Sequence, residues 1–271
     1  MNFHTYKVVH IHLSKVIQYI LFNYSNDPSN NSLITSYANN NICLGILKEK
    51  VIINDTNGTK KFQNKPGIQT YISAMYLEPH RFQVNGVFDE ICIDLTPVGY
   101  YHLFKKPLKT YMLEDNFLAE TWGNEAILFF EKVFEKKNFT KRGQMIEEFL
   151  VRKIQSSQNI FLMQCMHYIH SNSSLNLENV SRNMQCSQKK IIRTFQQYLD
   201  LTPKDYMKIL RFRKALWFIS YNKVSLTDVT YECGYYDQSH FIKDIRFFTG
   251  LQPKQLYSSL HNVNNDVLIS L

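Results

Sequence analysis

Two short segments near the C-terminal end carry similar sets of polar and basic residues at helical spacing. The two sets are Lys189, Ile192, Arg193 and Gln196, and Ser239, Ile242, Lys243 and Arg246. Residues three and four positions apart lie on one face of a helix. Each face therefore offers hydrogen-bond donors, cations and one aliphatic side chain. Such a face suits the edges of base pairs, where donors meet base acceptors and the aliphatic group meets a thymine methyl.

These faces belong to two copies of one unit. Leu177 and Val180 align with Leu226 and Val229. Ile191 aligns with Phe241 and is the first of several further matches, and all the matches have a spacing of about fifty residues. The spacing predicts a duplicated pair of helices. An ordinary solvated face is the alternative for either segment alone, and two equivalent faces argue against it.

Each unit carries the residues that begin helices and form tight turns. The predicted N-caps are Asn176, Ser187, Ser225 and Asp237. Asp228 can complete a capping box at the second copy. Gly234 supplies the turn between the two helices there, since glycine adopts left-handed backbone readily. Gln185 occupies the corresponding turn of the first copy, so that turn must form less easily.

One helix is predicted between the two copies, from Thr202 as cap and Pro203 as first residue to Ser220. A helix of about eighteen residues is roughly 27 Å long, and adjacent major grooves on one side of DNA are about 34 Å apart. The helix could hold two reading surfaces one turn apart. Its basic residues could contact phosphates, with solubility an equally good explanation; they are Lys208, Arg211, Arg213 and Lys214.

The second copy contains Glu232-Cys233-Gly234-Tyr235, then Asp237-Gln238-Ser239-His240-Phe241, then Phe248-Thr249-Gly250-Leu251-Gln252-Pro253. This pattern resembles the DNA-binding domain of the AraC/XylS family of transcription regulators over about residues 160–258. The resemblance implies two helix-turn-helix units that read adjacent major grooves of double-stranded DNA. The resemblance also nominates His240 as a residue that contacts a backbone phosphate. With the helical faces, the predicted DNA-binding set is Gln188, Lys189, Ile192, Arg193, Gln196, Gln238, Ser239, His240, Lys243 and Arg246.

Four residues depart from the family pattern. Thr230 replaces a small alanine, which predicts looser packing of its helix, and Ile245 replaces a phenylalanine. Asp200 replaces a glycine after the first recognition helix, although aspartate adopts left-handed backbone only moderately well. Asp244 puts a negative charge beside Lys243. These departures leave sequence preference and affinity open.

The N-terminal part predicts a different fold class. Runs 42–46, 51–53, 70–77, 81–87 and 88–95 are predicted strands, 25–40 a loop, and Asn57-Gly58 a tight turn. Apolar periodicity then predicts two helices, one around residues 126–134 and one around 145–154, with Thr140 as an N-cap. The expected fold is an α+β domain of antiparallel strands plus two helices, followed by an all-α domain with two helix-turn-helix units. The boundaries are 1–157, a regulatory or dimerisation domain; 158–262, the DNA-binding domain; and 263–271, a tail.

Two features of the N-terminal part allow more than one interpretation. One apolar helical stripe consists of Phe129, Phe130, Val133 and Phe134. The stripe either packs against the sheet or forms a homodimer contact, and packing against the sheet is favoured. Aromatic residues in 70–104 form an ordinary core or line a cavity for an apolar effector. The run 86–104 resembles a small α+β domain of some regulators in the family.

Composition bounds the remaining possibilities. The net charge is +8, which favours a polyanionic partner, and the five cysteines include no CxxC pair. Free thiols and the lack of a signal peptide or membrane span predict a cytoplasmic protein. Three pairs of residues lack the further partners that a metal site or an acid/base site would need. These pairs are His10 with His12, His80 with Glu78, and His167 with His170.

No phosphate-binding glycine loop or nucleophile motif occurs, so we expect neither an enzyme nor a cofactor. Double-stranded DNA is the expected partner. A small-molecule effector in the N-terminal domain, a homodimer and, for an activator, RNA polymerase are further partners that the resemblance implies. Two alternatives stay open: a DNA-tethered enzyme, which would need a cysteine cluster, and an architectural DNA binder that responds to no effector.

Overall fold

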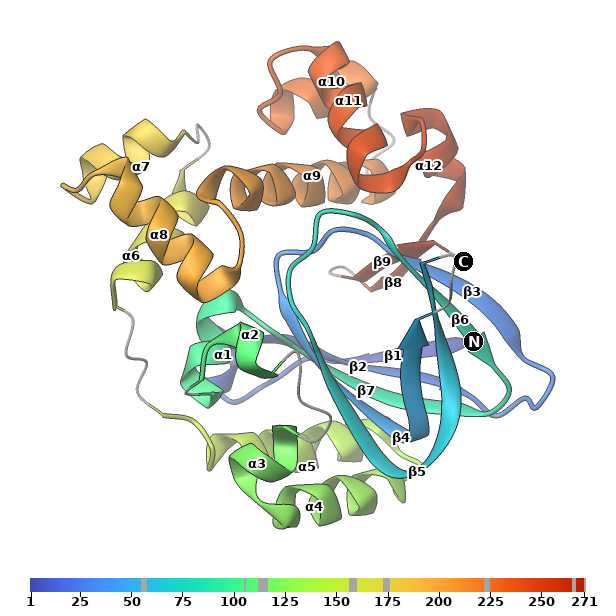
Figure 1. Ribbon diagram of the computed structural model, residues 1–271. Coiled ribbons are helices and arrows are strands. Elements are labelled where there is room, and N and C mark those ends of the chain that lie inside the picture. Colours follow the sequence, from blue (N-terminus) through green and yellow to red (C-terminus); the bar gives the residue numbers. More distant parts are fainter. Residues whose placement is uncertain are drawn as a thin grey trace. The chain divides into compact units, whose positions relative to one another are not determined.

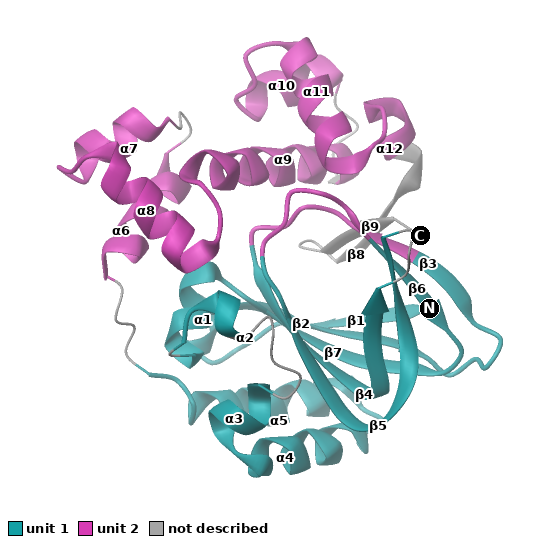
Figure 2. Cartoon of the chain, in the orientation of Figure 1, with its two compact units in different colours: residues 1–33, 41–74, 81–158 teal, residues 34–40, 75–80, 159–271 magenta. Residues whose placement is uncertain are grey.

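The computed structural model shows two compact units, which are coloured separately in Figure 2. The first contains residues 1–33, 41–74 and 81–158, and the second contains residues 34–40, 75–80 and 159–271. The structure describes residues 1–54, 58–104, 106–111, 117–155, 160–172, 176–221, 225–264 and 267–270. The predicted boundary at residue 157 and Asn57 of the predicted Asn57-Gly58 turn fall outside the described ranges.

The first unit is rich in strands (Figure 1). Its strands are β1 (Asn2–Tyr6), β2 (Ile17–Ser25), β4 (Ile42–Asn54), β5 (Thr59–Ser73), β6 (His80–Asn85, which starts in the second unit) and β7 (Phe88–Leu95). They pair in the order β1-β2-β7-β4-β5, with every one of these neighbours antiparallel. The expectation of a wholly antiparallel arrangement was wrong at one pair of strands, since Thr59 of β5 pairs in parallel with Arg81 of β6.

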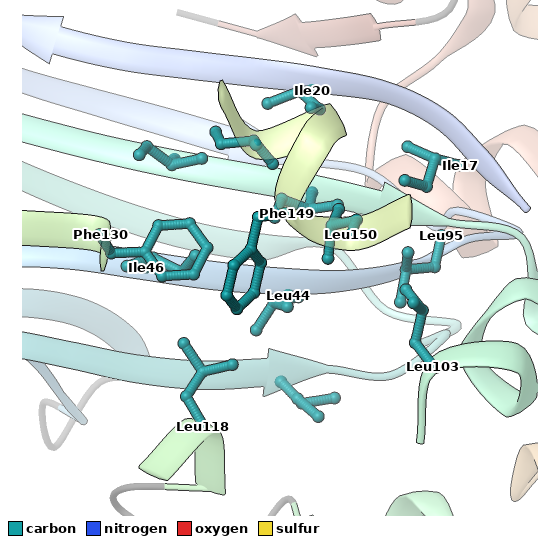
Figure 3. Packing of buried hydrophobic residues seen from close by; sticks show 14 of the residues in the cluster. Ile17, Ile20, Leu44, Ile46, Leu95, Leu103, Leu118, Phe130, Phe149 and Leu150 are labelled. Carbon is teal, nitrogen blue, oxygen red and sulfur yellow. The ribbon is translucent and has the colours of Figure 1, made fainter. Parts of the chain in front are cut away.

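Alternation along β7 explains how the sheet builds a core. Ile91, Ile93 and Leu95 are fully buried and belong to the apolar core of the unit. The residues between them point to the opposite face, as successive side chains in a strand must. Figure 3 shows this core, in which Phe130, Phe149 and other helical side chains lie over the residues of the sheet.

Among the described residues, five helices accompany these strands, where the sequence predicted two. They are α1 (Pro97–Leu103), α2 (Leu108–Tyr111), α3 (Phe117–Trp122), α4 (Asn124–Phe134) and α5 (Phe139–Val151), and a short 3-10 helix spans Leu13–Lys15. Of these helices, only α4 and α5 are long enough to show a clear helical spacing of apolar residues in the sequence. The cap of α5 is Asn138, whose Oδ1 accepts from Lys141 N at 2.9 Å, so the choice of Thr140 was wrong.

The aromatic stripe of α4 packs inside the unit. Phe130, Val133 and Phe134 are buried in the core, and Phe129 stacks on Phe149 of α5 with ring centroids 4.4 Å apart. The packing interpretation is therefore confirmed for this stripe. Leu128 is the exposed apolar residue of the helix, so α4 presents no apolar stripe to solvent.

Strand formation near the N-terminus was underestimated. β3 (Asn31–Ser36) lies inside the segment predicted as a loop, and β1 and β2 were not predicted. β4 is one strand where two were expected, with an irregularity at Glu49, whose φ is +55°. Polar strands such as β3 are recognised by their partners rather than by an alternating pattern.

The second unit is mostly helical. Its helices are α6 (Ile160–Ser171), α7 (Leu177–Asn183), α8 (Gln188–Leu199), α9 (Pro203–Tyr221), α10 (Leu226–Glu232), α11 (Gln238–Thr249) and α12 (Pro253–Ser259). The all-α expectation was wrong at the end of the chain. There β8 (Leu260–Asn264) pairs with β9 (Val267–Ser270), and β9 pairs with Thr35 and Ser36 of β3.

None of the helices in the described part of the chain combines the length and the apolar character needed to cross a bilayer. The five cysteines are free, and Cys92, Cys165 and Cys233 are buried. Burial raises the pKa of the Cys165 thiol to about 11. A buried, protonated thiol is a poor nucleophile, which suits a packing role for this residue.

Candidate nucleic-acid interface

Two pairs of helices in the second unit, α7 with α8 and α10 with α11, carry the predicted surface. All four predicted N-caps are confirmed: Asn176, Ser187, Ser225 and Asp237 each accept a hydrogen bond from a backbone N–H three residues on. At α10, Ser225 and Asp228 form the complete capping box. These bonds satisfy donors that the first turn of a helix leaves unpaired, so each helix starts at a defined residue.

The turns between the paired helices differ in one residue. Gly234 has φ +74° in the second turn, and Gln185 has φ +48° in the first. A residue with a Cβ atom loses about 1–2 kcal/mol in this left-handed region, whereas glycine does not. The first turn is therefore less favourable, as the sequence indicated.

Exchanging the residue types at these turns tests this strain. We expect Gln185→Gly to raise the free energy of unfolding of the second unit by about 0.5–1 kcal/mol, since the Cβ clash disappears. Gly234→Ala should lower it by about 1 kcal/mol for the same reason. Thermal unfolding of the full chain measures both. An unchanged stability for Gln185→Gly would contradict the strain argument.

The inward faces of α8 and α11 anchor both helices. Ile191, Phe195 and Leu199 of α8 are fully buried, and so are Phe241, Ile245 and Phe248 of α11. Ile245 and Thr230 therefore fit the core in spite of departing from the family pattern. Thr230 is also hydrogen-bonded, with its Oγ1 donating to Leu226 O at 2.7 Å. The expected looser packing of α10 does not occur at this residue.

The ten nominated residues all lie on α8 and α11, of which Gln188 and Gln238 are the first residues. Eight are exposed: Gln188, Lys189, Arg193, Gln196, Gln238, Ser239, Lys243 and Arg246. Ile192 and His240 are half-buried. Arg193 and Lys243 make no hydrogen bond or ion pair within the described residues, so their charges are free for a ligand. Gln238 is held in place, because its Nε2 donates to Thr227 Oγ1 at 2.6 Å.

Three of the four basic residues of α9 that were suggested for phosphate contact have partners inside the unit. Arg211 Nη2 lies 3.4 Å from Asp244 Oδ2, Lys208 Nζ lies 5.6 Å from the centre of the Phe247 ring, and Lys214 Nζ donates to Glu232 O. These contacts attach α9 to the second helix pair. The phosphate role suggested for α9 is therefore less favoured than the sequence indicated.

Two aspartates behave differently from expectation. Asp244 is buried and paired with Arg211, so its charge does not lie on the exposed face beside Lys243. Asp200 ends α8 in the left-handed conformation with φ +56°, in the place of the usual glycine. Aspartate tolerates this conformation better than most residues with a side chain.

The histidines weighed as metal or acid/base sites have other surroundings. His80 stacks on Tyr76 with ring centroids 3.9 Å apart. His170 Nε2 lies 2.8 Å from Tyr206 OH, and burial lowers the pKa of His170. His10 and His12 lie next to each other, but within the described residues no group of three His, Cys, Asp or Glu side chains could hold a metal ion.

The first unit buries a polar cluster on the sheet face opposite its apolar core. Asn23 Nδ2 and Tyr71 OH donate to Glu90 at 2.7 and 2.8 Å, and Asn41 donates to Asp94. Burial raises the pKa of Glu90. Sequence reasoning missed this cluster, because its members come from three different strands and from Asn41, the residue before β4. Its polar character does not fit the apolar effector considered for this region.

Comparison with known proteins points to the same segment. A family model described as a helix-turn-helix domain matches residues 180–258. The uncharacterized HTH-type transcriptional regulator YdeC of Bacillus subtilis strain 168 is 21% identical over 222 residues, which cover 72% of this chain and 76% of YdeC. The HTH-type transcriptional activator RhaS of Escherichia coli strain SE11 is 32% identical over 72 residues. That match covers 27% of this chain and spans only 26% of RhaS.

Solved structures also align with the chain. One is apo ToxT, as a variant, from Vibrio cholerae strain SCE256, with a TM-score of 0.45 and 10% identity over 88% of this chain and 97% of that chain. Another is a transcriptional regulator with an AraC-type DNA-binding domain from Chromobacterium violaceum, with a TM-score of 0.33 and 22% identity. That alignment covers 36% of this chain and 89% of that chain.

The curated relatives are named as transcription regulators rather than as enzymes. The matched segment begins inside α7 and ends in α12, so it includes α8 to α11 and the last part of α7. Residues 180–258 therefore match a helix-turn-helix domain, and the chain is similar to proteins named as HTH-type transcription regulators.

Proposed function

We propose that the protein is a sequence-specific transcription regulator that reads two adjacent major grooves of double-stranded DNA. In this proposal α8 and α11 are the recognition helices, and their exposed faces carry the base-reading side chains. The observation that carries the proposal is that Arg193 and Lys243, at equivalent places in the two helix pairs, are both exposed and unpaired within the described residues.

The length of α9 supports reading by both pairs. It has 19 residues, which corresponds to about 28 Å at 1.5 Å per residue. Two major grooves on one side of a duplex are about 34 Å apart, so a helix of this size can separate two readers by one turn of DNA. The positive charge of α8 and α11 attracts the phosphate backbone, and Arg193 and Lys243, together with the amides and the hydroxyl of these helices, contact base edges.

Other partners follow as part of the same proposal. A small-molecule effector bound by the first unit, a homodimer and contact with RNA polymerase would complete a regulator, which we expect to act in the cytoplasm. An architectural binder would lack the effector. Thermal stabilisation of the first unit by any member of a small-molecule library would favour the regulator over that alternative.

Selection of binding sites from random DNA with the full chain is the direct test. We expect a site with two conserved segments whose centres are about one helical turn apart. Arg193→Ala should relax the sequence preference in one segment and Lys243→Ala in the other. Relaxation of the same base pairs by both variants would refute reading by two helices.

Lys243→Ala also has a quantitative expectation. Loss of one good base contact costs about 1–3 kcal/mol of discrimination, so affinity for the selected site should fall at least fivefold. Affinity for scrambled DNA should change little. Both are measured by mobility shift at one salt concentration, because phosphate contacts make affinity depend on salt. Equal losses on both DNAs would exclude base reading by Lys243.

A further inference from the structure

One group of side chains connects α9 to α11 beneath the exposed face. Arg211 of α9 lies 3.4 Å from Asp244 of α11, and its guanidinium lies 4.9 Å from the centre of the Tyr235 ring. Tyr235 meets His240 edge to face, with ring centroids 5.2 Å apart. These four residues form a contiguous network between the two helices.

Both ring nitrogens of His240 face other groups of the protein. Its Nδ1 accepts from the backbone N–H of Tyr236 at 3.4 Å, which places the ring proton on Nε2. Nε2 in turn faces Asp244 Oδ2 at 3.8 Å. The nominated cation on the same helix, Lys243, has no such partner among the described residues.

Asp244 is the centre of the network. Its side chain is 10% exposed, and that of Arg211 is 25% exposed. A carboxylate this deeply buried needs a cation beside it, and the Arg211 guanidinium supplies that charge. The pair therefore fixes one side of α11 against α9 and leaves the other side free.

We propose that His240 and Asp244 are positioning residues: with Arg211 they set the orientation of α11, and through it the aim of Gln238 and Lys243 at the bases. The proposal rests on the proposed DNA-reading function and gives His240 a role other than the phosphate contact that the family resemblance nominates. A phosphate contact acts equally on any sequence, whereas the orientation of a reading helix acts on the specific site.

The test compares His240→Ala, Asp244→Asn and the double variant in the full chain. Affinity is measured for the selected site and for scrambled DNA at one salt concentration. We expect each single variant to weaken binding to the site about tenfold and to leave binding to scrambled DNA within about twofold. The double variant should be no weaker than the poorer single variant, because both residues act through one network.

Lys254→Gln is the reference for a sequence-independent loss. Lys254 is an exposed cation of α12 outside the network, and its removal should weaken binding to both DNAs by the same factor. An equal loss on both DNAs for His240→Ala would overturn the proposal in favour of a phosphate contact. So would an unchanged ratio of specific to non-specific affinity for Asp244→Asn.

Two further points keep the outcomes distinct. Thermal unfolding of each variant checks that it folds; His240→Gln and Asp244→Glu, which keep a hydrogen-bonding group, replace any that does not. Failure of the unaltered protein to select a site would contradict the proposed function itself, and would be seen before any variant is made.

Discussion

Phe248→Ala is expected to lower the free energy of unfolding of the second unit by about 3–5 kcal/mol. Phe248 is fully buried in α11, and its ring stacks on Phe212 of α9 with centroids 4.5 Å apart. Truncation leaves a cavity where two helices meet, so both the transfer of the ring from water and the contacts around it are lost. DNA affinity should fall with stability, because α11 loses its support.

The neighbouring residue provides a matched control. Phe247 is the same residue type on the same helix, but it is 50% exposed. Phe247→Ala should therefore cost less than about 1 kcal/mol. Fluorescence of Trp217 in a Trp122→Phe background follows urea unfolding of the second unit, since the chain has one tryptophan in each unit. Similar losses for the two variants would show that Phe248 is not an anchor.

Asp89→Asn should lower the free energy of unfolding of the first unit by about 3–5 kcal/mol, because it leaves a buried charge unpaired. Arg142 of α5 binds both carboxylate oxygens of Asp89 at 2.7 and 2.8 Å, and its side chain is only 5% exposed. Its remaining bonds go to the carbonyls of Phe134 and Lys136, which do not neutralise the charge. Arg142 thus ties α5 and the end of α4 to β7.

Glu120→Gln is the control for this second prediction. Glu120 pairs with Lys106 at 3.5 Å, but both side chains are about half exposed. Loss of an exposed pair costs less than about 1 kcal/mol. Fluorescence of Trp122 in a Trp217→Phe background reports unfolding of the first unit. If Asp89→Asn costs no more than Glu120→Gln, the buried pair does not hold the unit together.

The predictions from sequence succeeded where the signal is local. The Ser225–Asp228 capping box lies within four residues, and the inward face of α11 repeats at helical spacing. Both features are set by neighbours along the chain, so a single sequence contains them. The helix bounds and the exposure of Arg193 and Lys243 follow from them.

The predictions failed where distant residues decide the structure. β2 is buried on nearly all of its residues, so it lacks the alternation that marks a strand. Asp244 was expected at the exposed face, but its partner Arg211 is 33 residues away. The polar cluster around Glu90 likewise combines residues from strands far apart in the chain.

Residues 34–40 and 75–80 have a consequence for how this protein can be divided. Tyr37 and Ala38 are almost completely buried, in the same apolar cluster as Ile209 and Leu216 of α9. A gene fragment that starts at residue 158 would encode the helices but leave out Tyr37 and Ala38. We expect a fusion protein made with the helices alone to expose the apolar surface that Tyr37 and Ala38 cover in the full chain.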